Sequence, residues 1–388
     1  MVTDANRKTN EATAAAEASA VAERIQSLAM YKPGKSVEQA QRELGLGSFI
    51  KLASNENVLG PSPLAVDAIR RSTAEMHLYP DPDAFNLSSA LSRRLELPRE
   101  AILPGNGSDE LIHLLGVTLL EPGDEVIAGT PSFARYQAAA VLNRAAFHAV
   151  DLLPDGRYDV PAMARRVTAR TRLVFIANPN NPTGRHIDSD EMEQLLAVMP
   201  PRALLILDEA YGEYAAEAPG FPDSRAWIRR GAGVVALRTF SKAYGLAGLR
   251  VGYALGPPTV LSWLRRVREP FSVSLPAQSG AIAALEDVEH LRRTLEMNRR
   301  GKQIVVQLLA ALGLECPPSS ANFVWFDCGE SADEVARRLL QRGVIVRSGA
   351  HFGAPQHLRV TIGEESHMQV FGAALAAALA AGRGAGAL

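Results

Sequence analysis

Cysteine is nearly absent from this sequence: Cys316 and Cys328 are the only two among 388 residues. They lie twelve positions apart, with no CxxC pair and no histidine at the spacing of a metal ligand. This pattern excludes a disulfide framework and argues against a structural zinc site. We therefore expect two buried thiols and no bound metal.

An excess of charge is also lacking, since 41 Lys and Arg residues face 42 Asp and Glu residues. We therefore expect no nucleic-acid partner and no membrane partner. No apolar run approaches the roughly 18 residues of a membrane span, and residues 1–29 lack the compact apolar segment of a signal peptide. We expect a cytoplasmic protein. The segment before Leu52 contains no basic helix-turn-helix pattern, which disfavours a transcription factor.

The length and the hydrophobic pattern predict a large α/β domain. A chain of 388 residues corresponds to two or three domains of ordinary size. Between residues 50 and 270, short apolar runs alternate with amphipathic segments, which is typical of parallel strands covered by helices. We expect a central, doubly wound, mostly parallel sheet here. Its strands are expected at residues 126–128, 173–177, 204–207 and 234–237.

The pattern changes after residue 270 to that of an α+β unit. We expect this unit, together with the segment before Lys51, to form a smaller domain built from both chain ends. We therefore predict an N-terminal arm (1–49), a large domain (50–270) and a small C-terminal domain (271–388). In the last of these, helices are expected over residues 277–298, 300–312 and 332–342, and strands over residues 322–326, 344–346 and 358–362.

Three of the expected strands end in polar clusters. These are residues 178–184 (NPNNPTG), 208–211 (DEAY) and 238–242 (RTFSK). Ligands of open α/β sheets bind outside the carboxyl ends of the strands, so we expect the three clusters to form one site. Strand ends are often polar whatever their function. An acid directly after an apolar strand and a lysine in the same set nevertheless favour a chemical role.

Lys242 is the main candidate for a reactive group. The chain has six lysines, and Lys242 precedes the small and apolar residues 243–249. An amine removed from water has a lowered pKa and can act as a nucleophile. A surface lysine at a turn is the alternative interpretation.

A candidate phosphate site lies at residues 105–110 (GNGSDE), ahead of a helical run at 111–119. Glycine allows close approach to the backbone, and a helix N-terminus offers N–H groups to an anion. Arg250 would add a fixed cation. Alternatively, Ser108 or Asp109 simply caps the helix. The loop matches neither GxGxxG nor the P-loop, so the fingerprints of dinucleotide and ATP sites are missing.

These motifs resemble the class I and II aminotransferases of the fold-type I pyridoxal-phosphate superfamily, through residues 181–184 (NPTG), 208–211 (DEAY), 241–242 (SK) and 248–250 (GLR). The resemblance runs from about residue 31 to 363 and implies pyridoxal 5′-phosphate as the cofactor. It also implies a small amino donor and a keto acceptor as substrates. Similarity to the histidinol-phosphate aminotransferases extends over residues 51–63, 79–80, 105–110, 131–133, 320–323, 343–347 and 358–363.

The resemblance implies three catalytic residues. Lys242 would hold the cofactor covalently and then move a proton between the substrate Cα and the cofactor C4′. Asp208 would pair with the pyridine nitrogen, and Tyr211 would hydrogen-bond the ring 3-oxygen. Further cofactor contacts would come from Asn181 at the ring oxygen, Phe133 on the ring face, and Gly107, Ser108, Asp109, Thr239, Ser241 and Arg250 at the phosphate end.

The resemblance also implies substrate contacts and a dimer. Arg359 would clamp the substrate carboxylate, since a guanidinium pairs with it in a fixed orientation. Arg347 would read a phosphate at the far end of the substrate, Tyr31 would cover the substrate, and Asn55 would complete the pocket. Tyr79 would reach the cofactor phosphate of a neighbouring subunit, which implies a homodimer.

Two departures from the family pattern concern the substrate. Ser272 and Ser274 stand where many relatives carry asparagine, and Phe133 stands where many carry tyrosine. The leading interpretation is a transaminase of histidine biosynthesis, which interconverts L-histidinol phosphate plus 2-oxoglutarate and imidazole acetol phosphate plus L-glutamate. A phenylalanine-type aromatic aminotransferase is the first alternative. A pyridoxal-phosphate decarboxylase or lyase on the same fold is the second.

Overall fold

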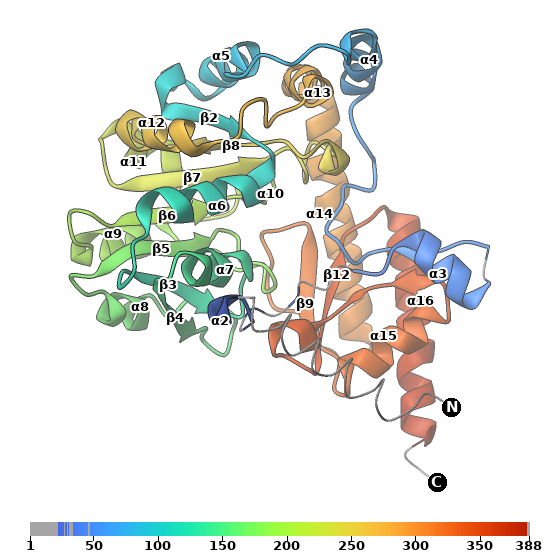
Figure 1. Cartoon of the computed structure of the whole chain (residues 1–388). Coiled ribbons are helices and arrows are strands. Elements are labelled where there is room, and N and C mark those ends of the chain that lie inside the picture. The colour runs from blue at the N-terminus through green and yellow to red at the C-terminus, as the bar shows by residue number, and fades with distance from the viewer. Residues whose placement is uncertain (1–21, 27, 29, 31–33, 46, 386–388) are drawn as a thin grey trace, which may run out of the picture.

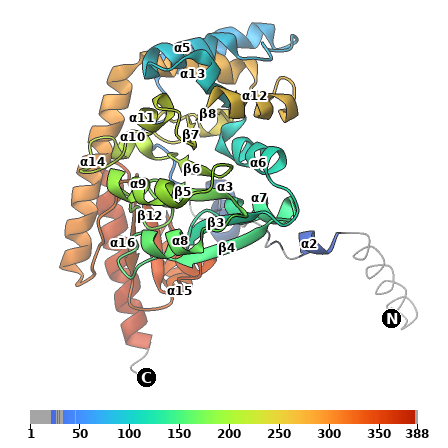
Figure 2. The same cartoon turned by 90° about the vertical axis from the view of Figure 1, so that its left-hand side faces the viewer.

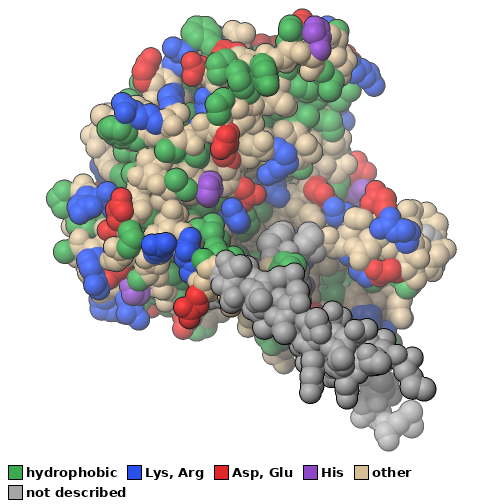
Figure 3. Space-filling view, in the orientation of Figure 1, with side chains coloured by type: hydrophobic (Ala, Val, Ile, Leu, Met, Phe, Trp, Pro, Cys, Tyr) green, Lys and Arg blue, Asp and Glu red, His purple; other side chains and the backbone are tan. Residues whose placement is uncertain are grey.

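The protein is described here from a computed structural model, which covers residues 22–26, 28, 30, 34–45 and 47–385 (Figure 1). Tyr31, one of the predicted substrate contacts, lies outside the described residues. No helix in the described part is long and apolar enough to cross a membrane. Lys, Arg, Asp and Glu are interspersed over the face shown in Figure 3.

The larger part of the molecule is built on a seven-stranded sheet with the order β2-β8-β7-β6-β5-β3-β4. Strands β3 to β7 are parallel to one another, and β8 runs antiparallel to both of its neighbours. The prediction of a mostly parallel α/β sheet is therefore confirmed. The strands are β2 (Ile102–Gly105), β3 (Glu125–Thr130), β4 (Ala146–Asp151), β5 (Thr171–Ala177), β6 (Leu204–Asp208), β7 (Val234–Thr239) and β8 (Gly252–Leu255).

Helices cover both faces of this sheet (Figures 1 and 2). Successive side chains of a strand point to opposite faces, so both faces must be apolar. Leu205 and Leu207 of β6 belong to one buried cluster and Ile206 to the other. The first face is covered by α4 (Pro63–Ser72), α5 (Phe85–Leu95), α8 (Val160–Arg166), α9 (Ser189–Val198), α11 (Ser224–Arg229) and α13 (Leu275–Glu286), and the second by α6 (Gly107–Leu119), α7 (Arg135–Leu142) and α12 (Pro258–Val267).

The smaller part combines segments from both ends of the chain. Strand β1 (Ile50–Lys51) pairs in parallel with β10 (Val344–Ile345). An antiparallel sheet has the order β11-β12-β9, and α14 and α16 lie side by side against it (Figures 1 and 2). The other elements of this smaller part are α3 (Val37–Leu44), β9 (Phe323–Asp327), α14 (Val288–Ala311), α15 (Ala332–Leu340), β11 (Arg347–Ser348), β12 (His357–Thr361) and α16 (Glu365–Ala385).

Short helices connect these elements. They are α2 (Glu23–Gln26), α10 (Gly212–Ala215), η1 (Thr73–Glu75), η2 (Arg99–Ala101), η3 (Ala247–Leu249) and η4 (Gly349–Phe352). The division of the chain into residues 1–49, 50–270 and 271–388 stays a prediction. Apolar side chains of α13 nevertheless join the buried cluster of the large sheet, together with α4 and α5.

The predicted boundary between the two long helices was wrong. We expected helices at 277–298 and 300–312, whereas α13 ends at Glu286 and α14 runs without a break from Val288 to Ala311. The reason is Asp287, whose carboxylate accepts a hydrogen bond of 3.0 Å from the His290 N–H and so caps α14. The expected start of the helix at 111–119 also shifts, because α6 begins at Gly107.

Candidate active site

A cavity of about 720 Å³ lies at the carboxyl ends of the parallel strands and extends to β11 and β12. This confirms the prediction that the three polar strand tips meet. Adjacent strands in register bring them together, since Ala177 of β5 pairs with Asp208 of β6, and Asp208 with Leu237 of β7. The predicted site residues that line the cavity are Asn55, Ser108, Asp109, Phe133, Asn181, Asp208, Tyr211, Thr239, Ser241, Lys242, Arg250, Arg347 and Arg359.

Lys242 presents its amine in this cavity. The amine donates a hydrogen bond of 3.1 Å to the carbonyl oxygen of Ser54 and lies 5.7 Å from the centre of the Tyr211 ring. Burial, followed by the positive charge of Arg359, lowers the pKa of Lys242 to about 8. About a tenth of the amine is therefore neutral at pH 7, far more than for a lysine in water. A neutral amine at the base of a cavity can act as a nucleophile.

Asp208 is buried at the end of β6, with 5% of its surface exposed. Burial raises the pKa of its carboxyl to about 6. The groups that donate to it within the described residues are neutral: the Tyr136 hydroxyl at 2.8 Å and the Ala210 N–H at 3.2 Å. A buried carboxylate with neutral donors is complementary to a cationic ring nitrogen.

The N-terminus of α6 and Arg250 form a cradle for an anion. Helix α6 has no side-chain cap, so its first N–H groups are available to a ligand. Arg250 packs against Gly107, where an added Cβ would lie 2.7 Å from a guanidinium nitrogen and displace it, and the backbone φ of +74° also favours glycine. Arg250 also donates to the Ser241 hydroxyl at 3.4 Å, and Ser241 is bonded in turn to Thr239. Asp109 lies 3.6 Å from Arg250 and balances part of its charge.

Arg347 and Arg359 enter the cavity from two neighbouring antiparallel strands. They are directly opposite each other in the β11–β12 pair, and each is more than nine-tenths buried. Arg359 donates to the Asn181 side chain and, at 2.6 Å, to the Ala53 carbonyl. Its guanidinium carbon lies 5.5 Å from the Phe323 ring and 5.6 Å from the Phe352 ring. Two fixed guanidinium groups side by side are suited to an anionic substrate.

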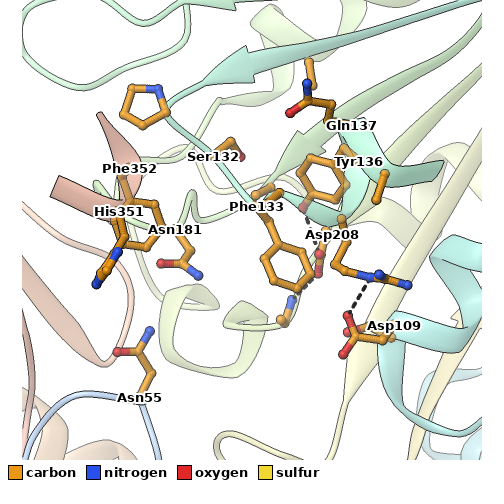
Figure 4. Close-up of a pocket in the computed structure, with 18 of the residues that line it drawn as sticks. Asn55, Asp109, Ser132, Phe133, Tyr136, Gln137, Asn181, Asp208, His351 and Phe352 are labelled. Atoms are coloured by element: carbon orange, nitrogen blue, oxygen red, sulfur yellow. Dashed lines mark hydrogen bonds and ion pairs between the residues drawn. The ribbon is translucent and has the colours of Figure 1, made fainter. Parts of the chain in front are cut away.

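The walls of the cavity are partly aromatic (Figure 4). Phe133 lies beside Asp208 and Tyr136, with its ring edge-on to Tyr136 at 5.8 Å, whereas His351 and Phe352 lie across the cavity. Phe133 is placed to cover one face of a flat ring held at Asp208.

Some of the predicted residues do not line the cavity of the single chain. Tyr79 does not line the cavity; it is 82% exposed and stacks on Phe271 with 4.5 Å between ring centres. Ser272 and Ser274 do not line it either, and Ser274 instead caps α13 through the Ala277 N–H. Among the described residues, no cluster of three His, Cys, Asp or Glu side chains is arranged to hold a metal.

Sequence reasoning missed three residues of the site. Tyr136 lies in the first turn of α7, three residues after Phe133, and this closeness in sequence was the available signal. His351 and Phe352 belong to η4, which directly follows β11. Their closeness in sequence to Arg347, a predicted site residue, was the available signal that they also line the cavity.

The residues of the cavity fit pyridoxal 5′-phosphate. The amine of Lys242, the buried carboxylate of Asp208 and the anion cradle are the three groups that an aldehyde, a protonated pyridine and a phosphate require. Gly107 leaves room for the Arg250 guanidinium beside the N-terminus of α6.

Comparison with known proteins gives consistent results. The sequence model of the family described as aminotransferase class I and II matches residues 48–375. The chain is 46% identical over 360 residues to the histidinol-phosphate aminotransferase of Moorella thermoacetica, covering 92% of each chain. It is 45% identical to that of Symbiobacterium thermophilum, covering 94% of this chain and all of the relative.

A solved structure has the same fold. The histidinol-phosphate aminotransferase of Sinorhizobium meliloti in complex with pyridoxal-5′-phosphate matches with a TM-score of 0.85. It is 29% identical in sequence, and the match covers 93% of this chain and 98% of that one.

Proposed function

Because the chain belongs to the class I and II aminotransferases, we propose that its cavity is the active site of a histidinol-phosphate transaminase that uses pyridoxal 5′-phosphate. The reaction interconverts L-histidinol phosphate plus 2-oxoglutarate and imidazole acetol phosphate plus L-glutamate, which is a step of histidine biosynthesis.

The observation that carries the proposal is the pairing of Arg347 with Arg359 in the cavity that contains Lys242. The enzyme must accept two substrates that share an amino or keto group but differ at their anionic ends. Histidinol phosphate has a phosphate and no carboxylate, whereas glutamate has two carboxylates. Two fixed guanidinium groups serve both, with Arg347 at the phosphate or the side-chain carboxylate and Arg359 at the α-carboxylate.

The cofactor, when bound, supplies an electron sink for negative charge that develops at the substrate Cα. Asp208 would hold the pyridine nitrogen in its protonated form, and the burial of its carboxylate would strengthen that ion pair. Arg250, Ser241, Thr239, Ser108 and Gly107 hold the phosphate, with Asp109 beside Arg250. Asn181 and Tyr211 bind the ring oxygen, and Phe133 covers the ring face.

Lys242 has two roles in the proposal. Its amine would form the covalent link that holds the cofactor, and as a free amine it would move a proton between the substrate Cα and the cofactor C4′. A pKa near 8 suits both roles, because the amine can lose and regain a proton close to neutral pH. On the substrate side, the family resemblance predicts a contact from Asn55 and a cover by Tyr31.

A direct test supplies the loaded protein with imidazole acetol phosphate and L-glutamate. We expect 2-oxoglutarate and L-histidinol phosphate in equal amounts. Release of CO2 without consumption of the keto substrate would instead identify a decarboxylase and contradict the proposal.

We also propose that the enzyme is a homodimer in which Tyr79 completes the site of the partner. Apolar side chains around α4, η1 and α5 face solvent in the single chain, and this supports an interface there. They are Leu64, Met76, Leu78, Tyr79 and Phe85, all at least half exposed. The cytoplasmic location stays a prediction.

Mixing two inactive variants tests the shared site. Tyr79→Ala and Lys242→Ala subunits, unfolded and refolded together, form hybrids with one intact site each. About a quarter of the wild-type activity should return, because half of the dimers are hybrids with one site in two intact. No recovery, although both variants dimerise by light scattering, would contradict a contribution of Tyr79 to the neighbouring site.

A further inference from the structure

We propose that Asn55 is a positioning residue for Tyr211: its side-chain amide donates to the Tyr211 oxygen and thereby directs the Tyr211 proton toward the ring oxygen of the cofactor. The inference rests on the proposed function, and it assigns to Asn55 a part other than direct substrate contact.

Asn55 is held rigidly in an unusual conformation. It is 1% exposed, and its backbone φ is +56°, in the left-handed region that asparagine tolerates better than most residues. Its N–H donates to the Thr361 hydroxyl at 2.9 Å, and its carbonyl accepts from the Asn322 side chain at 3.0 Å. The side chain therefore starts from a backbone fixed on both sides.

Thr361 determines which way the Asn55 amide points. The Thr361 hydroxyl oxygen accepts the N–H of Asn55, so its own proton is available to the Asn55 side-chain oxygen, 3.2 Å away. The amide oxygen faces Thr361 in the structure, and this orientation gives the Thr361 proton an acceptor, which an NH2 group there would not. The amide nitrogen consequently faces Tyr211, at 2.9 Å from the phenolic oxygen.

The Tyr211 oxygen accepts in this bond, which settles the direction of its proton. A phenol has one proton, and Asn55 offers a donor and no lone pair, so the O–H of Tyr211 must point away from Asn55. The ring itself is held edge-on against Phe323, with 5.1 Å between ring centres. The phenol lines the cavity that contains Lys242. There its proton would be offered to the ring 3-oxygen of the proposed cofactor.

The test is the pH midpoint at which the absorbance of the lysine-bound cofactor changes. A proton donated by Tyr211 stabilises the anionic ring oxygen and keeps this midpoint low. In Asn55→Asp the new carboxylate has the same shape but accepts only, so it draws the Tyr211 proton away. We expect the midpoint to rise by roughly one to two pH units, as for the loss of a hydrogen bond to a charged oxygen, and Tyr211→Phe should shift it similarly.

A double variant separates this effect from the charge of the new carboxylate. The charged groups that act on Lys242 include Arg359, Arg250, Glu56 and Asp109, and none of them is altered. If Asn55 acts through the Tyr211 proton, Asn55→Asp adds little to the shift already present in Tyr211→Phe. A shift of equal size in both backgrounds would be electrostatic and would overturn the proposal.

A further variant keeps the test informative if Asn55→Asp folds poorly. Asn55→Gly tolerates the positive φ and removes the donor without adding charge, so we expect a smaller rise of the midpoint. If the midpoint is unchanged in folded Asn55→Gly and Asn55→Asp but shifted in Tyr211→Phe, the role proposed for Asn55 is overturned, whereas that of Tyr211 stands. Absence of any lysine-bound absorbance in the wild type would instead contradict the proposed function.

Discussion

The buried carboxylate of Asp208 accepts a hydrogen bond of 2.8 Å from the hydroxyl of Tyr136, itself fully buried. Tyr136 in turn stacks on Phe175, with 4.7 Å between the ring centres. A neutral donor leaves the negative charge of Asp208 to be balanced by a ligand, which suits a carboxylate meant for a cationic ring nitrogen. Without a ligand, this buried negative charge is not balanced and lowers the stability of the fold.

The buried charge of Asp208 is expected to lower the free energy of unfolding of the cofactor-free protein in a pH-dependent way. The pKa of Asp208 is raised to about 6 in the fold, from an ordinary value of 3.8. The folded state therefore binds this proton more tightly, and the carboxyl costs stability increasingly as the pH rises from about 4 through about 6, up to about 3 kcal/mol. Asp208→Asn should stabilise the cofactor-free protein above pH 6 and hardly change it near pH 4.

Urea unfolding of both cofactor-free proteins, at about pH 4 and about pH 7.5, measures this difference. The same variant should lose activity, since the amide cannot hold the pyridine nitrogen protonated. Equal stability of the two proteins at both pH values would show that the buried carboxylate of Asp208 does not destabilise the fold.

Lys242 is predicted to be the residue that carries the cofactor. Borohydride reduction followed by peptide mass spectrometry should find the label on Lys242, and Lys242→Ala should lose both the lysine-bound absorbance and turnover. Lys302 is the matched control, because burial also lowers its pKa to about 8, but its amine donates to the Ser319 carbonyl away from the cavity. Label on Lys302, or turnover by Lys242→Ala, would contradict this assignment.

Arg347 is predicted to discriminate between substrates. Arg347→Gln should lower kcat/KM for L-histidinol phosphate by about 10- to 100-fold, the loss expected for a hydrogen bond to a charged group. For L-phenylalanine, which has no distal anion, we expect at most a few-fold loss. Steady-state kinetics with both amines measures the ratio, and equal losses on both would remove the role of Arg347 as phosphate reader.

The pair Glu209–Arg238 is predicted to stabilise the strand tips that carry the site. Glu209 follows Asp208, is fully buried, and accepts from Arg238 at 2.8 Å and from Ser224 at 3.0 Å. Removing Arg238 leaves a buried carboxylate without its cation, so Arg238→Met should lower the free energy of unfolding by about 3–5 kcal/mol. Arg292→Met, which breaks the exposed pair with Glu289, should cost less than about 1 kcal/mol in the same urea titration. Similar losses in both variants would show that burial of the pair does not matter.

The parallel core of the fold could be predicted because its strands are apolar on both faces. Strands β5, β6 and β7 follow the runs at 173–177, 204–207 and 234–237 closely. Strand β4 could not be found this way, because it lies at the edge of the sheet and most of its side chains are partly or fully exposed. The break at Asp287 was missed because one capping residue between two helical segments barely changes their periodicity.

The cofactor side of the site was easier to predict than the substrate side. Lys242, Asp208 and Asn181 stand in short motifs directly after strands, where the topology places ligands. Tyr136, His351 and Phe352 enter the cavity from α7 and η4, and only tertiary packing brings them there. Asn55 was expected to touch substrate. Its hydrogen bonds to Tyr211 and Thr361 could not be predicted, because they join residues more than 150 positions apart in the sequence.

A half-reaction on the pyridoxal-phosphate-loaded protein tests the assigned substrate most directly. The protein is mixed separately with L-histidinol phosphate and L-phenylalanine, and the loss of the lysine-bound absorbance is followed over time. We predict a fast loss with L-histidinol phosphate and a much slower one with L-phenylalanine. A faster loss with L-phenylalanine would identify an aromatic aminotransferase and contradict the assignment of Arg347 and Arg359 to a phosphorylated substrate.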